Sequence, residues 1–319
     1  MRRLTVLAVL ILVLFLFAGC AKVMGPYYLE QREYEEGVKV FSERLQNNPD
    51  DDSAAYYVGR YYLAMKQPKK AMPFFKQAAK LDPEDADFRF WIGVTYWATL
   101  EFEKERQAYI EALILDSNHI SANLYLGHGF VDEKKWADAL AQYDKVISLD
   151  RYNPEALYNR AVALKGLGRH KEEVAALKKF LKYYPDGSLA MRATVRLNLQ
   201  GEFSYRNFIL GKRNVTLKSM TFKPGTNDLV LSSKESLHVI AAMMSVNKKL
   251  DLHIVGYKKG DTATAKAHAE SVRDYILAGR PEFDPKRLPL SWFGTAEQVS
   301  MGGKTFPLDD SVKFITVVR

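Results

Sequence analysis

Few side chains in this sequence stand in arrangements that could bind a metal ion or catalyse a reaction. Six histidines occur without metal-ligand spacing, and the only cysteine, Cys20, lies in an apolar N-terminal segment. No serine elbow is present. We therefore expect no metal site, no cofactor, no catalytic residue and no enzyme activity. The histidines are His119, His128, His170, His238, His253 and His268.

The segment MGGKTFP, residues 301–307, ends like a phosphate-binding loop. Such a loop needs a first glycine where Gln298 stands, and a helix where Pro307 follows. We interpret this segment as a polar turn.

The N-terminal segment could undergo processing chemistry. Arg2 and Arg3 precede an apolar run from Leu4 to Ala18, an order typical of a secretory signal peptide. A retained membrane span is the alternative, but about 15 apolar residues fall short of the roughly 20 that cross a bilayer. With one cysteine, no disulfide can form within the chain.

The end of this segment, FAGC, resembles the lipobox of bacterial lipoproteins, with Phe17 where Leu is commoner. The resemblance implies that residues 1–19 are removed and that Cys20 is lipidated, so that several acyl chains anchor the protein. Ala21, where Asp would be a retention signal, fits release to the outer membrane. A free or buried cysteine after an ordinary signal peptide is the alternative.

A regular repeat organises the middle of the chain. Pro49 and Pro83 mark one period of the repeat, and small and large residues recur in phase between and beyond them. This pattern resembles the tetratricopeptide repeat, a pair of antiparallel helices whose small residues let the helices approach. The recurring positions are Val58, Gly59, Tyr62, Ala71, Phe75 and Ala78, then Ile92, Gly93, Tyr96, Tyr109 and Ala112, then Leu126, Gly127, Phe130, Ala139 and Tyr143.

A fourth unit runs from Pro154 to Pro185 and carries Glu173 where a small residue is usual. Residues 28–49 fit a shortened first unit, and residues 187–200 are expected to form a capping helix. We predict an all-α tetratricopeptide solenoid over residues 20–200.

The first helices leave an apolar and aromatic stripe once their packing positions are assigned. Such a concave face suits a peptide or helix bound through aromatic anchors, and we predict a partner groove there. Packing of the stripe against the chain's own last domain is the alternative. The stripe comprises Tyr56, Arg60, Leu63, Phe90, Val94, Trp97, Leu124, His128, Val131, Tyr158, Val162 and Lys165.

After Gln200 the helical period gives way to strands alternating with helices. Strands are expected over residues 213–226, which end in a Pro-Gly turn, and over 250–257 and 311–319. Helices are expected over 232–246, capped by Ser232 or Ser233, and after the turn at 258–261. This order predicts an α/β two-layer sandwich with Phe222, Val255, Trp292 and Phe314 in its core.

Residues 201–319 resemble the OmpA-like peptidoglycan-associated domain. Gly256, Tyr257, Lys258 and Lys259 stand where that family has G-H-T-D, and His268-Ala269 stands where it has R-A. The family's aspartate and arginine hold the zwitterionic end of diaminopimelate in the wall peptide.

The resemblance therefore implies a degenerate peptidoglycan site at Tyr257, Lys258, Lys259, Asp261 and His268. Lys259 reverses the first charge, and His268 lacks the guanidinium fork. Asp261 stands in for the family's loop asparagine or is a plain helix N-cap. We interpret the lysine-rich turn as a lost site on a retained frame, with altered wall binding through the two lysines as the alternative.

Charge is uneven along the chain. Residues 201–319 contain 18 Lys and Arg against 12 Asp and Glu, within a formal net charge of +8. This excess favours an anionic partner such as wall polymer or membrane surface. Nucleic acid is not expected, because no basic stripe or recognised nucleic-acid module accompanies the excess.

Together these features predict an outer-membrane lipoprotein that faces the periplasm and is a scaffold for other envelope proteins, docked through its repeat groove. The alternative is a peptidoglycan-tethering lipoprotein whose last domain binds the cell wall.

Overall fold

The computed structural model describes residues 21–318, so the expected signal peptide and Cys20 lie outside the described residues. The chain divides into two compact units, Met1–Leu167 and Gly168–Arg319, and each unit has its own buried core. Within the described range, no helix combines the length and the apolar character needed to cross a membrane.

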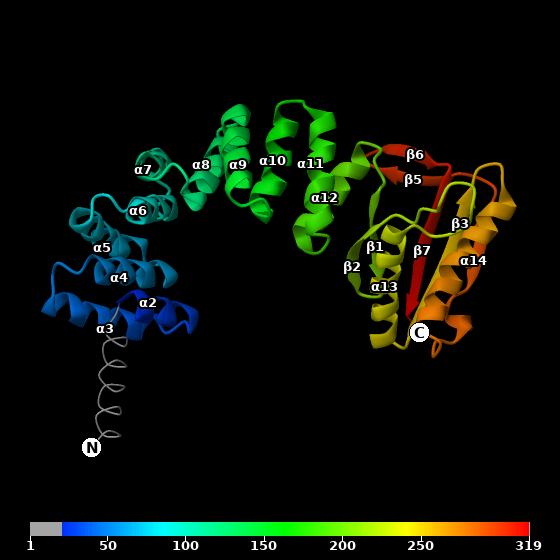
Figure 1. The fold of residues 1–319 in the computed structure, drawn as a ribbon, viewed down its shortest axis with the longest axis horizontal. Coiled ribbons are helices and arrows are strands. Elements are labelled where there is room, and N and C mark those ends of the chain that lie inside the picture. The colour runs from blue at the N-terminus through cyan, green and yellow to red at the C-terminus, as the bar shows by residue number, and fades with distance from the viewer. Residues whose placement is uncertain (1–20, 319) are drawn as a thin grey trace, which may run out of the picture. The chain divides into compact units, whose positions relative to one another are not determined.

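The first unit consists of helices joined by short turns into successive antiparallel pairs (Figure 1). The helices are α2 (Ala21–Glu30), α3 (Tyr34–Asn47), α4 (Asp52–Ala64), α5 (Pro68–Leu81), α6 (Ala86–Ala98), α7 (Phe102–Leu115), α8 (Ile120–Asp132), α9 (Trp136–Leu149) and α10 (Pro154–Gly166).

Local sequence fixes both ends of each first helix. Asp51, Asp85, His119 and Asn153 occupy the same position in successive repeats, and each accepts a hydrogen bond from a backbone N–H in the first turn of its helix. Such N-caps satisfy helix-end donors that otherwise lack partners. The turns after the first helices have positive φ angles between 59° and 63°, at Arg32, Lys66, Leu100 and Lys134.

The small residues of the repeat do what the sequence predicts. A Cβ added at Gly93 would lie 2.4 Å from the Tyr109 ring, so only glycine lets α6 and α7 approach this closely. Gly59 against Phe75 and Gly127 against Tyr143 repeat the arrangement at 2.8 Å. The tetratricopeptide hairpins are thereby confirmed at the level of packing.

The second unit begins with two helices and continues into strands. Its elements are α11 (His170–Tyr183), α12 (Gly187–Leu199), β1 (Tyr205–Leu210), β2 (Arg213–Lys218), α13 (Leu231–Val246), β3 (Leu250–Lys258), α14 (Thr262–Gly279), the short 3-10 helix η1 (Pro285–Arg287), β4 (Leu290–Phe293), β5 (Glu297–Met301), β6 (Lys304–Leu308) and β7 (Asp310–Val318).

The expected capping helix is present as α12, and it is joined to the strands. Asn198 Nδ2 donates hydrogen bonds of 2.8 Å to the carbonyl oxygens of Glu202 and Tyr205. Asn207 Nδ2 donates to the Met191 carbonyl at 3.1 Å. These bonds explain why the compact units divide at Leu167, whereas the change from helices to strands follows Leu199.

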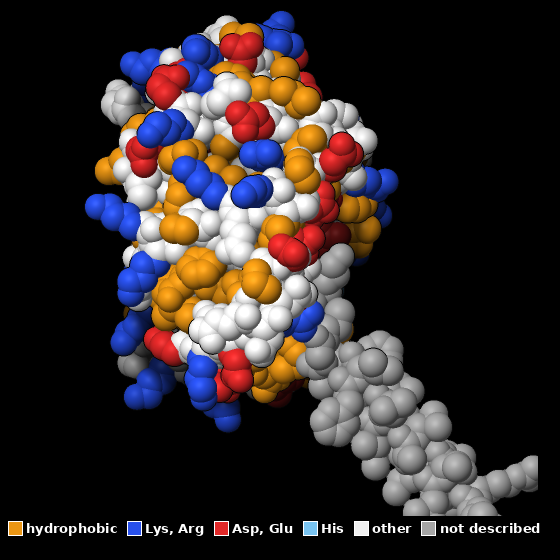
Figure 2. Space-filling model, turned by 90° about the vertical axis from the view of Figure 1, so that its left-hand side faces the viewer, with side chains coloured by type: hydrophobic (Ala, Val, Ile, Leu, Met, Phe, Trp, Pro, Cys, Tyr) orange, Lys and Arg blue, Asp and Glu red, His pale blue; other side chains and the backbone are white. Residues whose placement is uncertain are grey.

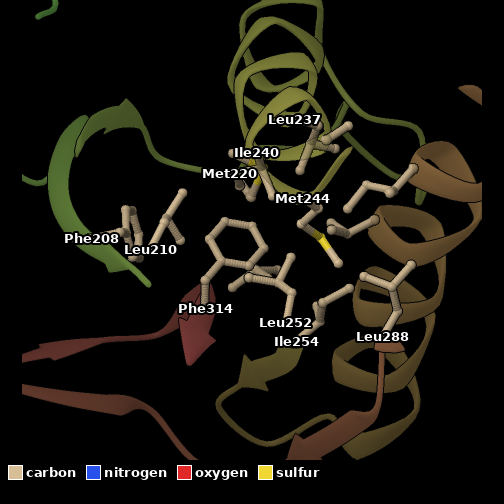
Figure 3. Close-up of a cluster of buried hydrophobic side chains, with 14 of the residues drawn as sticks. Phe208, Leu210, Met220, Leu237, Ile240, Met244, Leu252, Ile254, Leu288 and Phe314 are labelled. Atoms are coloured by element: carbon tan, nitrogen blue, oxygen red, sulfur yellow. The ribbon is translucent and has the colours of Figure 1, made fainter. Parts of the chain in front are cut away.

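A three-stranded sheet, ordered β4-β3-β7, lies at the centre of the second unit. Strand β3 pairs parallel with β4 and antiparallel with β7, and β1/β2 and β5/β6 form separate hairpins. Figure 3 shows side chains of α13, among them Leu237 and Met244, pointing toward Ile254 on β3 and Phe314 on β7. Ile315 and Val317, which point to the other sheet face, are 43% and 58% exposed.

Two sequence predictions in this unit are wrong. Helix α13 starts at Leu231 after Val230, and the Ser233 hydroxyl bonds the backbone of Thr221 instead of capping the helix. Trp292 is 38% exposed because it lies on β4, a strand paired on one side only. Val255 and Phe314 are buried, and Phe222 packs partly buried against the same core.

Candidate functional site

Two cavities open on the repeat helices and share one exposed side chain, Trp97. The Trp91 cavity, of about 520 Å³, is lined by Leu29, Arg60, Leu63, Trp91, Val94 and Trp97, among others. The Glu105 cavity, of about 410 Å³, is lined by Trp97, Phe102, Glu105, Tyr109, Tyr125, His128 and Asp132, among others.

Part of the predicted groove does line these cavities. Arg60, Val94 and Trp97 line the Trp91 cavity, while Trp97 and His128 line the Glu105 cavity. Sequence reasoning missed Trp91, because the stripe at helical spacing ran through its neighbour Phe90. A stacked aromatic beneath an arginine has no sequence signal of its own.

Other predicted groove residues are core. Phe90, Leu124 and Tyr158 are only 4%, 7% and 8% exposed. The Phe90 ring lies against the rings of Tyr109 and Tyr125, with both centroids at 5.5 Å. These three side chains are buried inside the repeat array. The prediction that they anchor a partner is therefore wrong.

Two further predicted groove residues lie outside the cavities. Tyr56 packs beside Phe75 and Phe88, and Lys165 is exposed without lining either cavity.

Arg60 forms a fixed wall of the Trp91 cavity. Its guanidinium lies 3.7 Å from the Trp91 ring centroid and 5.4 Å from that of Tyr56, and it donates a hydrogen bond to the Tyr56 hydroxyl. Burial raises the pKa of Tyr56 to about 12, with Arg60 opposing that rise. Stacking of this kind holds a guanidinium in place while leaving the rest of the cavity apolar.

The Glu105 cavity contains a buried acid. Glu105 is 8% exposed, and burial raises its pKa to about 7; the neighbouring Tyr109 hydroxyl opposes this rise, and the negative charge of Asp132 adds to it. His128 receives a 3.1 Å hydrogen bond at Nε2 from Asn159 Nδ2, and burial lowers its pKa. Near neutral pH the imidazole is therefore uncharged.

Exposed hydrophobic side chains surround both cavities. Trp97 and Phe102 are 55% and 57% exposed, and Leu100 between them is 72% exposed. The face drawn in Figure 2 carries patches of hydrophobic side chains interrupted by Lys and Arg. Contiguous exposed apolar surface of this kind marks interaction sites in soluble proteins.

In the second unit, the lysine-rich turn is charge-balanced. Lys258, the last residue of β3, has its Nζ 2.8 Å from an Asp310 carboxylate oxygen. Lys259 has its Nζ 3.8 Å from Asp309. Of the two acids that balance these lysines, Asp310 begins β7 and Asp309 directly precedes that strand, and the sequence interpretation included neither of them.

The His268 side chain is buried. It is 3% exposed, and the Phe222 ring stacks on it with centroids 3.5 Å apart and planes 8° from parallel. Its Nδ1 lies 3.1 Å from Asp310 Oδ1. Burial would raise the pKa of Asp310, but hydrogen bonds from His268 and Lys258 hold that pKa below its usual value.

The remaining residues of the expected wall site have local roles. Asp261 is the N-cap of α14 and accepts a 2.9 Å hydrogen bond from the Thr264 backbone N–H, as its N-cap interpretation predicted. Tyr257 stacks on Phe293 with ring centroids 5.4 Å apart. Of the five predicted residues, His268 is therefore buried, Asp261 caps a helix, Tyr257 stacks on Phe293, and the two lysines lie beside carboxylates.

Within the segment 301–307, Gly302 and Gly303 form the turn of the β5/β6 hairpin, with φ angles of 58° and 74°. Two successive positive φ angles fit a tight hairpin turn, so the turn interpretation is confirmed for these two residues, whereas residues 304–307 lie in strand β6. Among residues 21–318, no group of three or more His, Cys, Asp or Glu is placed to hold a metal ion.

Tetratricopeptide repeats are shown by comparison with protein families. Family models described as tetratricopeptide repeat match residues 23–83, 59–120 and 155–187, and one described as TPR repeat matches residues 127–168. No match was found among curated protein sequences.

Three solved structures illustrate the similarity, and of these only PilF has a TM-score above 0.5. PilF of Pseudomonas aeruginosa is 19% identical, with a TM-score of 0.51 over 56% of this chain and 81% of PilF. MamA is 21% identical, with a TM-score of 0.46 over 50% of this chain and 93% of MamA. YrrB is 21% identical, with a TM-score of 0.45 over 53% of this chain and 87% of YrrB. At these identities the likeness shows the fold alone.

The chain therefore contains tetratricopeptide repeats, which are followed by a small strand-containing C-terminal region. Tetratricopeptide proteins are in general scaffolds for protein-protein interaction, which fits cavities lined by exposed aromatic side chains.

Proposed function

We propose that this protein is a periplasm-facing outer-membrane lipoprotein whose repeat array docks another envelope protein. The observation that carries the docking function is the pair of cavities joined by the exposed Trp97. Aromatic side chains at such positions dominate the binding energy of many interfaces. The signal-peptide pattern and the FAGC motif support the location, with Cys20 as the lipid anchor.

The C-terminal region is proposed to have an OmpA-like frame that stiffens the assembly without binding the wall. The order β3, α14, β4 supports the frame, since α14 packs on both strands. The pairing of Lys258 with Asp310 and the burial of His268 support the loss of the site. The tethering alternative has the basic excess of residues 201–319 in its favour.

The docking function is tested by affinity capture from the envelope fraction with full-length tagged protein. Trp97→Ala should remove at least about 90% of a specifically captured protein, since an anchor of this kind contributes about 2 kcal/mol or more. Trp292→Ala is the matched control, because Trp292 is also exposed but lies in the other unit. Capture that survives Trp97→Ala unchanged would refute the groove.

A further inference from the structure

The second repeat carries a buried glutamate where its neighbours carry alanine. Ala71, Glu105, Ala139 and Glu173 occupy the same position of successive repeats. The two alanines are completely buried, and the two glutamates are 8% and 2% exposed. A buried carboxylate is costly unless a cation or several hydrogen bonds satisfy it.

The two glutamates differ in how they are satisfied. Glu173 receives hydrogen bonds from Arg196, at 3.1 Å from Nε and 2.5 Å from Nη2. Glu105 forms no ion pair with any Lys, Arg or His in the described chain. At equivalent repeat positions, the Glu173 carboxylate is therefore paired with a guanidinium and the Glu105 carboxylate is not.

The surroundings of Glu105 do not supply the missing cation. Arg106, on the same cavity wall, is already bonded to Glu103 and Glu133. Asp132 adds a second negative charge that opposes ionisation of Glu105. The cavity is therefore acidic without an internal counter-ion for its buried member.

The walls fit a flat cation. Trp97 and Tyr125 are aromatic lining residues, 55% and 38% exposed, whose faces attract a guanidinium. The Tyr109 hydroxyl, in a side chain 1% exposed that also lines the cavity, has no hydrogen-bond partner of good geometry within residues 21–318. Its lone pairs can accept an N–H from an occupant.

From these contacts we infer that the Glu105 cavity receives the arginine side chain of a docked protein. Arginine fits better than lysine, because its planar fork can bond a carboxylate with two N–H groups while stacking on an aromatic ring. The Arg196–Glu173 pair shows this chain using that solution at the equivalent position. The inference deepens the proposed function and rests on it, since the arginine comes from the docked partner.

The test uses full-length protein labelled with 5-fluorotryptophan and observed by fluorine NMR. The chain has four tryptophans, and Trp97→Phe assigns the resonance of Trp97. The probe is N-acetyl-arginine methylamide, and its uncharged isostere N-acetyl-citrulline methylamide is the ligand control. A single side chain should bind in the millimolar range, with Kd of roughly 1–10 mM.

We expect a saturable shift of the Trp97 resonance with the arginine probe and none with citrulline. Glu105→Gln should weaken binding at least about tenfold, because it removes the charged acceptor. Glu84→Gln, which removes an equal charge from an exposed side chain that lines neither cavity, should change binding less than about twofold. Unchanged resonances of the other three tryptophans show that each variant is folded.

No Trp97 shift at about 50 mM arginine probe, far above the expected Kd, would overturn the inference. An equal response to the citrulline control would also overturn it. So would tighter binding of a third probe, N-acetyl-lysine methylamide, measured in the same way. These outcomes are separate from the docking function, because capture that depends on Trp97 would still support docking when the arginine probe fails to bind.

Discussion

At the residue scale, two buried glutamates at equivalent repeat positions differ in whether a cation pairs with them. Glu173 is bonded to Arg196, whereas Glu105 has no ion pair with a Lys, Arg or His among residues 21–318, and Arg106 on the same cavity wall is bonded to Glu103 and Glu133. The equivalence of Glu173 and Glu105 in the repeat was available in the sequence as a signal. Whether each glutamate has a partner was not, since Arg196 comes from a helix that caps the array.

Substitution to alanine at these two equivalent positions should have opposite effects. Glu105→Ala removes an unpaired buried acid and restores the residue found at Ala71 and Ala139, so the free energy of unfolding should rise by about 1–2 kcal/mol. Glu173→Ala removes the buried carboxylate to which the Arg196 guanidinium is bonded and should lower that free energy by about 2–3 kcal/mol. Urea denaturation followed by circular dichroism measures both, and equal destabilisation by the two variants would contradict this account.

The stability contributed by Glu105 should depend on pH. Burial raises the pKa of Glu105 from an ordinary value of 4.5 to about 7 in the folded protein, so the folded state binds more protons than the unfolded state between these pH values. Stability from this group therefore falls as pH rises from about 4.5 to 7. The other titratable groups lining the cavity are Glu103, Arg106, Tyr109, Tyr125, His128, Asp132 and Glu133.

Comparison with Glu105→Gln isolates this effect. Wild type and variant should be similarly stable at about pH 5, and the variant should be more stable by about 1–2 kcal/mol at about pH 8, allowing for partial solvent screening. Thermal unfolding across this pH range gives the difference. A difference that does not change with pH would show that Glu105 is ionised throughout.

At the element scale, each repeat is built from signals that lie close together in the sequence. Asp85 caps α6 through hydrogen bonds of 2.8 and 3.3 Å from the N–H groups of Asp87 and Phe88. Gly93 then gives the Tyr109 ring its space. Cap, small residue and ring recur from one repeat to the next, which is why sequence alone located the hairpins.

Removing one cap should cost a predictable amount. Asp85→Ala loses both hydrogen bonds to the first turn of α6 and should destabilise the repeat array by about 1 kcal/mol. Glu84→Ala, at the exposed position just before it, should change stability by less than about 0.5 kcal/mol. Parallel urea titrations compare them, and equal effects would mean that the cap contributes nothing.

The strand-rich unit was less predictable because its elements depend on distant partners. Ser233 has the residue type of an N-cap, but its hydroxyl is held by the Thr221 backbone. The β5/β6 hairpin and β1 went unpredicted, and Trp292 was assigned to the core although its strand is at a sheet edge. Local patterns do not reveal which strand will lie at an edge.

The residues of the predicted groove could also be predicted only in part from the sequence. Helical spacing correctly placed Arg60, Val94 and Trp97 on a cavity wall. It could not separate them from Phe90, which has the same spacing but packs on Tyr109 and Tyr125 of its own and the next hairpin. The exposure of a helix side chain depends on how neighbouring repeats pack against it, so the residue pattern within one helix cannot predict that exposure.

At the scale of the whole molecule, one compact unit contains the two cavities around Trp97 and the other contains the lysine-rich turn. The two functions can therefore be tested separately. The proposed lipid anchor at Cys20 would attach both units to the membrane.

Wall binding should be absent or weak. Protein lacking residues 1–20 should stay in solution with purified sacculi at high salt, because Asp310 and Asp309 neutralise Lys258 and Lys259. Binding seen only at low salt would reflect the basic excess of residues 201–319. Co-sedimentation that persists at high salt would instead support the tethering alternative.

The central claim is that the repeat array docks a protein at the cavities around Trp97. Site-specific photocrosslinking in cells tests it most directly, with a benzophenone side chain at Ala98, which lines the Trp91 cavity, or at Ile114, which is 76% exposed and lines neither cavity. We predict one discrete crosslinked species from position 98 that disappears with Trp97→Ala, and none from position 114. No adduct from position 98, or the same adduct from both positions, would contradict the account.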